Sequence, residues 1–154
     1  MSTISGPRTV HRLIYGSLHR LPPGDEDHEL AAIIRASISN NRAQSITGLL
    51  LLHKGYFVQA LEGPAEAVLT TFGRICSDPR HVSPRTIHAG PAASREFGDW
   101  NMCARRITPA DDAILDTLSM RQKFDPSKLT ARTSLKLLVA VRAVQERTQL
   151  AALG

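Results

Sequence analysis

The sharpest pattern of apolar and polar positions runs through residues 46–64, ITGLLLLHKGYFVQALEGP. Two apolar stretches flank Lys54-Gly55, a pair typical of a hairpin turn because glycine adopts positive φ without steric cost. The pattern therefore predicts two short strands joined by that turn. Side chains alternate along a strand, so Phe57, Gln59 and Leu61 share one face of the second strand.

Gln59 is the polar exception on that face, since its two neighbours are large and apolar. Their apolar character predicts that the face is buried. A buried amide must find hydrogen-bond partners, or it destabilises the fold by about 1–3 kcal/mol. Two interpretations stay open at this point: the amide braces nearby backbone, or it belongs to a functional site.

A strand and a helix are predicted before the hairpin. Residues 10–15 form a compact β-type run that ends in Tyr15. Further on, apolar residues follow the i, i+3, i+4 spacing of an amphipathic helix, and acidic residues gather at its start. This helix is expected to end at Asn40-Asn41.

A second helix and two more strands are predicted after the hairpin. The helix begins at Pro64, because proline suits the first helical position, and Asp78-Pro79 ends it. The strands are expected at residues 85–89 and 101–107. The resulting order is β-α-β-β-α-β-β.

This order predicts an α+β fold, a ferredoxin-like sandwich with both helices on one face of the sheet. We expect the first strand and the Gln59 strand to lie parallel at the centre of the sheet. Tyr15 and Gln59 then become neighbours beneath the two helices, where phenol and amide form a buried polar pair.

The C-terminal part predicts two further helices, at residues 109–122 and 127–150. The second carries a wide apolar surface that must be covered. We expect both C-terminal helices to lie on the sheet face opposite the first two helices, with any remaining apolar surface against another subunit or an effector.

Six ordered segments of this sequence resemble the BLUF domain, the flavin-binding blue-light sensor. They are Leu13-Ile14-Tyr15, Asn40-Asn41, Ile46-Thr47-Gly48, Phe57-Val58-Gln59-Ala60-Leu61-Glu62-Gly63-Pro64, Arg74-Ile75 with Asp78-Pro79-Arg80-His81, and Trp100-Asn101-Met102. The resemblance implies that FAD binds noncovalently with its ring between the two helices, with FMN or riboflavin as alternatives. It also implies roles for individual residues.

By this resemblance, Tyr15 is the phenol that gives an electron and a proton to the photoexcited flavin. Gln59 links that phenol to the flavin edge, and its hydrogen bonds reorganise in light. Asn41 matches the amide that holds the ring, with Asn40 as a second candidate. The alternative interpretation of Asn40-Asn41 is a helix C-terminal signal without a role in binding.

The resemblance further implies that Asp78, Arg80 and His81 bind the cofactor, and that Trp100 and Met102 are switch residues on the last strand. The alternatives are an exposed loop for Arg80 and His81, and ordinary core packing for Trp100 and Met102. No catalytic residue is assigned, because the cofactor returns to its starting state and no substrate is turned over.

The expected organisation is a flavin-binding domain over residues 8–107 and a helical extension over residues 108–154 for output or oligomerisation. The predicted function is a blue-light photoreceptor, not an enzyme, that signals to a separate effector protein. A homo-oligomer is also expected. We weigh one alternative function in this fold class, a nucleic-acid- or protein-binding module without flavin.

Charge is uneven along the chain. Residues 1–104 carry ten Lys or Arg against nine Asp or Glu, and residues 105–154 carry nine against five, which gives a net charge of +5 for the whole chain. A basic solvated surface is the default explanation, and attraction to an acidic partner is the alternative. Direct nucleic-acid binding is disfavoured, because no groove-reading motif or interleaved aromatics accompany the charge.

Other classes find little support in the composition. There is no 18-residue apolar run and no signal-peptide pattern, so no membrane association and a cytoplasmic location are expected. Cys76, Cys103 and six scattered histidines match no metal-ligand spacing, so no metal is predicted. An acyl-phosphate hydrolase would need an anion-cradling loop after the first strand, and residues 16–23 lack the small residues for one.

Overall fold

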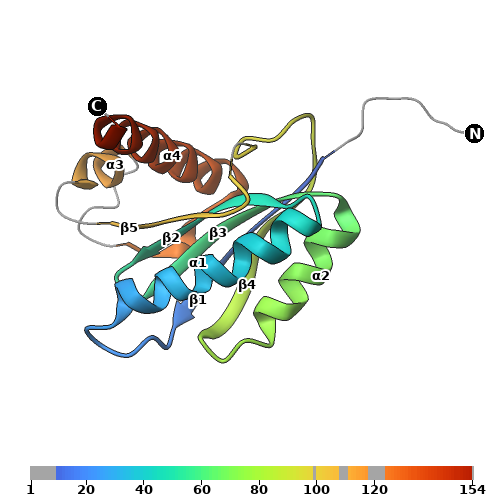
Figure 1. The fold of residues 1–154 in the computed structure, drawn as a ribbon, viewed down its shortest axis with the longest axis horizontal. Helices are drawn as coiled ribbons and strands as arrows, with labels where there is room; N and C mark the ends of the chain where they lie inside the picture. Colours follow the sequence, from blue (N-terminus) through green and yellow to red (C-terminus); the bar gives the residue numbers. More distant parts are fainter. Residues whose placement is uncertain (1–9, 99, 108–110, 118–123, 154) are drawn as a thin grey trace, which may run out of the picture.

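The computed structural model describes residues 10–98, 100–107, 111–117 and 124–153 (Figure 1). Within them, five strands and four α-helices follow one another, with one short 3-10 helix. In chain order they are β1 (Val10–His19), α1 (Glu26–Ala43), β2 (Thr47–His53), β3 (Tyr56–Gly63), α2 (Ala65–Cys76), β4 (His81–Ala92), β5 (Cys103–Arg106), α3 (Asp112–Thr117), η2 (Pro126–Lys128) and α4 (Ala131–Leu153).

The strands form one mixed sheet in the order β4-β1-β3-β2-β5. β1 and β3 are neighbours at the centre, as predicted, but they run antiparallel and not parallel. The reason is the hairpin: β3 turns back beside β2 and enters between β2 and β1, so it opposes both of them. The outer strand β5 pairs with β2 in parallel. The fold is the ferredoxin-like α+β sandwich expected from the element order.

The hairpin turn matches its sequence. Lys54 has φ 48° and Gly55 has φ 86°, so both central residues have positive φ, as a type I′ turn requires. The prediction assigned positive φ to the glycine alone. Every residue of β2 is buried, and so is every residue of β3 after Tyr56. The hairpin therefore forms the middle of the sheet and not an edge.

Two apolar layers enclose the sheet. α1 and α2 pack on one face, where Tyr15, Phe57 and Leu61 meet Leu30 of α1 and Val68 of α2. α4 lies on the other face (Figure 1). The residues that join α4 to the sheet are apolar on both sides: Ile14, Leu49, Leu51, Val58, Leu137, Leu138 and Val141. The C-terminal helix thus covers the face opposite α1 and α2, as its apolar surface predicted.

Several boundaries differ from the sequence prediction. α1 continues to Ala43 and so includes the asparagine pair, and Pro64 lies one residue before α2 as its N-cap. β4 is much longer than residues 85–89, and β5 begins only at Cys103. Trp100 and Met102 therefore precede the last strand instead of lying on it.

The C-terminal helices also differ from their predicted ranges. Part of the predicted helix at residues 109–122 is α3, and residues 109–110 and 118–122 of it lie outside the described residues. The longer helix starts at Ala131, after the 3-10 turn that Asp125 caps. None of the helices in the described part of the chain is long and apolar enough to cross a bilayer.

Gly48 provides a test of the central packing. A Cβ at this position would lie 2.1 Å from the backbone oxygen of Ala60 on β3, so Gly48→Ala must push two paired strands apart. We expect the free energy of unfolding in urea to fall by about 1–3 kcal/mol.

Gly73→Ala is the matched control, because a Cβ there meets nothing within 4 Å on α2. This variant should be more stable than the wild type by about 0.5–1 kcal/mol, since alanine favours a helix over glycine. Equal unfolding midpoints for the two variants would contradict this description of the β2–β3 contact.

Candidate functional site

A buried pair of polar side chains lies at the centre of the sheet. Tyr15 on β1 stands directly opposite Gln59 on β3, on the face that α1 and α2 cover. The Tyr15 hydroxyl donates a hydrogen bond to Oε1 of Gln59, and the two side chains are 0% and 4% exposed. Burial raises the pKa of Tyr15 well above its usual value, so the phenol keeps its proton at any ordinary pH. The sequence predicted this contact.

Gln59 has a second partner on its other side. Its Nε2 donates to the sulfur of Met102 over 3.2 Å, and Met102 is buried in the same layer. The amide therefore uses its oxygen as acceptor for Tyr15 and one of its two N–H donors on Met102. This arrangement joins the phenol, the amide and the segment before β5 in one chain of contacts.

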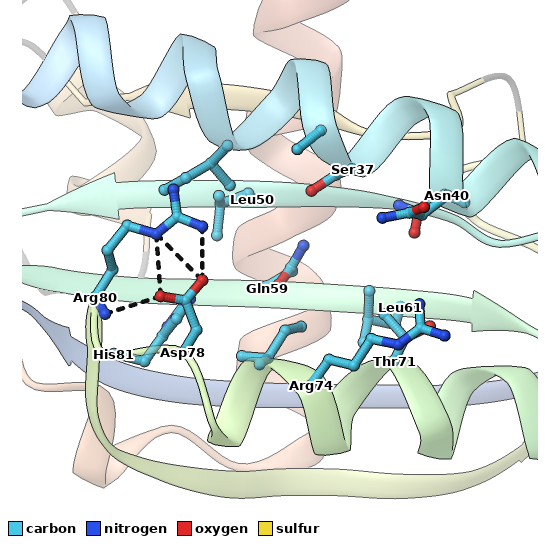
Figure 2. A pocket seen from close by; sticks show the side chains of 14 residues that line it. Ser37, Asn40, Leu50, Gln59, Leu61, Thr71, Arg74, Asp78, Arg80 and His81 are labelled. Carbon is cyan, nitrogen blue, oxygen red and sulfur yellow. Dashed lines mark hydrogen bonds and ion pairs between the residues drawn. The ribbon is translucent and has the colours of Figure 1, made fainter.

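A cleft opens above this pair between α1 and α2. Its empty space is about 720 Å³ when the part open to solvent is included. Apolar side chains from both helices and from the sheet line its walls: Ile33, Leu50, Leu61 and Ile75. Figure 2 shows Gln59 on the floor, with Asp78, Arg80 and His81 toward one end and Asn40 toward the other.

An ion pair fixes one end of the cleft. Arg80 Nη2 lies 2.6 Å from Asp78 Oδ2, and Arg80 Nε lies 3.0 Å from Asp78 Oδ1 (Figure 2). The hydrogen bonds from Arg80 lower the pKa of Asp78, and those to Asp78 raise the pKa of Arg80. Both groups are therefore charged at neutral pH and hold each other in place.

His81 is the first residue of β4 and lies deeper in the cleft. Its Nδ1 is 2.9 Å from Oγ of Ser17, and its ring packs on Phe57 and Tyr15 with centroid distances of 4.6 Å and 5.9 Å. Burial lowers the pKa of His81 to about 4, so the imidazole is neutral at pH 7. The exposed-loop alternative does not describe this residue.

The asparagine pair lies in the last turn of α1. Asn40 and Asn41 both line the cleft, but Asn41 is 3% exposed and Asn40 is exposed. Asn41 Nδ2 donates to the backbone oxygen of Asn101 over 2.8 Å. Asn41 therefore connects the cleft to the segment that carries Met102, which a helix-end signal alone would not require.

Trp100 and Met102 lie on different sides of the sheet. Met102 belongs to the layer under α1 and α2, while Trp100 is half-buried and packs against the layer beneath α4. The structure thus places Met102 against the polar pair and Trp100 away from it. The two residues are close in sequence, but they connect to opposite layers.

Among the polar residues that line the cleft, the sequence prediction did not include Ser37 and Thr71, and it assigned no site role to Arg74. Thr71 and Arg74 are three residues apart on α2, and Figure 2 shows them on the α2 wall. Thr71 precedes Ile75 by four residues, so helical spacing places these two on the same side of α2. This spacing was visible in the sequence, but it indicates a binding site only once the cleft beside α2 is known.

Comparison with known proteins identifies the family. The BLUF family model, described as sensors of blue-light using FAD, matches residues 10–103, and the chain belongs to this family. The photoactivated adenylate cyclase subunit beta of Euglena gracilis is 35% identical over 145 residues, which cover 94% of this chain and 16% of that protein.

Two further comparisons support the assignment to this family. The blue light- and temperature-regulated antirepressor BluF of Escherichia coli is 40% identical over 68 residues, which cover 43% of this chain and 17% of that protein. The dark-state structure of BlrB, a BLUF protein, superposes with a TM-score of 0.71 at 29% identity and covers 89% of this chain and 99% of that one. The chain spans about 16% of the length of the cyclase beta subunits it matches.

The residues of the cleft suit the cofactor of this family. A flavin ring is flat and apolar on its faces and carries hydrogen-bonding groups along one edge. The cleft offers the same division: apolar walls from Leu50, Leu61 and Ile75, and amides from Asn41 and Gln59. A nucleic-acid-binding module would instead expose aromatics on the opposite face of the sheet, and α4 covers that face.

The neutral state of His81 predicts a specific acid sensitivity. The unfolded chain takes up a proton near the ordinary histidine pKa of about 6.5, and the folded chain does so only near about 4. Between these values the unfolded state binds more protons, so the free energy of unfolding should fall as pH drops from 6.5 to 4. Urea unfolding at a series of pH values measures this slope.

His81→Gln removes the titrating group and keeps a polar side chain. Its unfolding free energy should depend less on pH over the same window, while loss of stability below pH 4 remains because Asp78 has a lowered pKa. An unchanged slope between pH 6.5 and 4 would show that another group causes the sensitivity.

Proposed function

We propose that this protein is a blue-light photoreceptor in which Tyr15 and Gln59 convert absorption into a change of hydrogen bonding. The observation that carries the proposal is the contact chain from Tyr15 through Gln59 to Met102 on the floor of the cleft. The amide at its centre is buried, accepts from Tyr15 and gives one of its two N–H donors to Met102. Any change at the phenol therefore acts directly on the amide.

FAD supplies the absorber when bound, and its excited ring is a strong oxidant. With that oxidant in the cleft, Tyr15 would give up an electron and its hydroxyl proton together. Loss of the electron alone would leave a buried radical cation and loss of the proton alone a buried phenolate, whereas loss of both leaves a neutral tyrosyl radical, the form that burial favours. The proton would move along the hydrogen bond to Oε1 of Gln59, and the amide would pass on one of its own N–H protons, so that the ring would receive both the electron and a proton. When electron and proton return to Tyr15, the chain has consumed nothing.

Gln59 then keeps a changed arrangement of hydrogen bonds. Its amide carries a donor and an acceptor on one rotatable group, so it can reverse or tautomerise when Tyr15 briefly loses its proton. In the present arrangement Nε2 is occupied by the sulfur of Met102. A reversed amide releases Met102 and presents a different group to the cleft, which accounts for a small spectral shift.

The remaining cleft residues hold the ring. We assign Asn41 and Asn40 to one end of the cleft and Asp78, Arg80 and His81 to the other. The support is their common lining of one cleft from three separate segments of the chain. Arg80 and Asp78 hold each other in place, and His81 is neutral, so this end presents a fixed pattern of donors and acceptors.

The output route leads through the sheet to α4. We propose that residues 8–107 form the sensor and residues 108–154 carry output or oligomerisation. The contacts of Arg105 support this route. Arg105 of β5 contacts Asp111 at 2.7 Å and Gln145 of α4 at 2.9 Å. A shift of the segment that contains Met102 would reach α4 through β5.

A second contact joins β3 to α4. The carboxylate of Glu62, three residues after Gln59, accepts hydrogen bonds from the backbone of Glu96 and Phe97. Arg142 of α4 contacts the Glu96 carboxylate at 2.9 Å. Arg142 and Gln145 lie three residues apart on one side of α4, so both routes end on the same helical surface.

The effector is proposed to be a separate protein, and the sensor itself a homo-oligomer without catalytic activity. The names of the relatives describe a cyclase subunit and an antirepressor, so related sensors serve two different outputs. The excess of positive charge after residue 104 favours an acidic partner surface.

The proposal predicts a coloured, light-sensitive protein. Purified protein should be yellow, and blue light should shift its flavin absorption slightly to longer wavelength, with recovery in darkness. Gln59→Leu should keep the flavin and lose the shift, because leucine has no hydrogen bond to reorganise. Tyr15→Phe should abolish the normal photocycle and leave the fold intact, since only a hydroxyl is removed.

Tyr56→Phe is the matched control, since Tyr56 lies on the α4 side of the sheet and away from the cleft. It should retain the full shift. Protein that stays colourless after addition of FAD would refute the function. A normal shift in Gln59→Leu would remove Gln59 from the mechanism.

The output route predicts a light-dependent change in α4. Hydrogen exchange in darkness and under steady blue light should differ in β5 and in at least part of α4. Met102→Ala should reduce the α4 difference while the spectral shift survives, because the amide loses its link to β5. The expected coupling is about 1–3 kcal/mol.

Arg106→Ala serves as the control on β5, because Arg106 pairs with Asp27 of α1 and not with α4. It should leave the light response of α4 intact, whereas Arg105→Ala should weaken it. Exchange that changes only around the cleft, with α4 unaffected, would place the output surface elsewhere, such as the loop between β1 and α1.

A further inference from the structure

The hydroxyl of Ser17 forms a hydrogen bond with the His81 ring from the side of the sheet. Ser17 follows Tyr15 by two residues on β1 and is 4% exposed. Its Oγ lies 2.9 Å from Nδ1 of His81, and this is its one hydrogen-bond partner among the residues that the structure describes. The contact lies on the sheet side of the imidazole, which also lines the cleft.

The direction of this hydrogen bond follows from burial. A neutral imidazole carries one proton, on either Nδ1 or Nε2. If Nδ1 held it and donated to Ser17, the serine's own proton would be left buried without an acceptor, which folded proteins avoid. If Ser17 donates to Nδ1, its proton is paired and the imidazole proton must lie on Nε2.

We propose that Ser17 is a positioning residue that holds His81 as the neutral tautomer with its proton on Nε2. The inference rests on the proposed function, because it gives the flavin cleft a fixed hydrogen-bond donor at this end. Such a donor suits a carbonyl oxygen of the kind that a flavin carries on its pyrimidine ring. A His81 free to exchange tautomers would offer an acceptor part of the time.

The neighbours of His81 keep the imidazole from turning away. Its ring is packed against Phe57 and Tyr15, and Asp78 and Arg80 lie just before it in the chain. Asp78 and Arg80 are already paired with each other, so Ser17 supplies the contact that selects between the two ring nitrogens. The role therefore needs a hydroxyl at position 17 and not merely a small side chain.

The test is nitrogen NMR of the histidine rings in the isotope-labelled protein, where the His81 signals are identified by their loss in His81→Gln. In the wild type, His81 should show an unprotonated Nδ1 and a protonated Nε2. Ser17→Ala should bring the two shifts closer together as both tautomers become populated. Ser17→Thr should restore the wild-type pattern, because it keeps the hydroxyl.

Ser77→Ala is the matched control, since the Ser77 hydroxyl bonds to the backbone of Gly73 and not to the ring. It should leave the His81 shifts unchanged. A protonated Nδ1 in the wild type, or shifts in Ser17→Ala identical to the wild type, would overturn the proposal.

A second measurement relates the tautomer to the ligand. Riboflavin affinity, measured by fluorescence titration, should fall by about 2- to 10-fold in Ser17→Ala and recover in Ser17→Thr. Unchanged affinity despite mixed tautomers would overturn the ligand role. Wild-type protein that binds no flavin would refute the proposed function, and the NMR result, which needs no flavin, would still decide the role of Ser17.

Discussion

The hydrogen bond between Tyr15 and Gln59 is the interaction on which the rest of the site depends. It exists because two central strands place these residues opposite each other, and because both helices on that face exclude water from them. A buried amide of this kind is tolerated only with its partners in place. Because each side chain depends on the other for a hydrogen bond, a change in the protonation or orientation of one forces the other to change its hydrogen bonding.

The second apolar layer explains how such a local change can have a consequence outside the cleft. α4 covers the far face of the sheet, so the strands lie between two packed layers. Met102 faces the cleft layer, and Trp100, two residues earlier, faces the α4 layer. This short segment thus contacts both sides of the sheet. Arg105 and Arg142 then add polar contacts with defined geometry between the sheet side and the helix.

Much of the fold could be predicted because the apolar pattern is strong where the core is. The hairpin, both covering helices, the α4 layer and the neighbourhood of Tyr15 and Gln59 all followed from spacing. The direction of β3 was predicted wrongly. The prediction placed β3 in a β-α-β unit with β1, although the hairpin returns β3 between β2 and β1, antiparallel to both. The extent of β4 was missed because Pro84 and Pro91 interrupt the usual strand pattern. At the site, Ser37 and Thr71 were not recognised until the cleft between α1 and α2 was known, and Arg74, although part of the resembling segments, had been given no role there.

The central claim is that light acts on this protein through the Tyr15–Gln59 hydrogen bond. Light-minus-dark infrared difference spectra of the flavin-loaded protein, with isotope-labelled tyrosine and glutamine side chains, test it most directly. The claim predicts that each label shifts bands of the difference spectrum, that Tyr56→Phe leaves the tyrosine-dependent bands in place, and that Gln59→Leu removes the glutamine-dependent ones. A difference spectrum unaffected by either label would contradict it, because the light-driven change would then lie outside this pair.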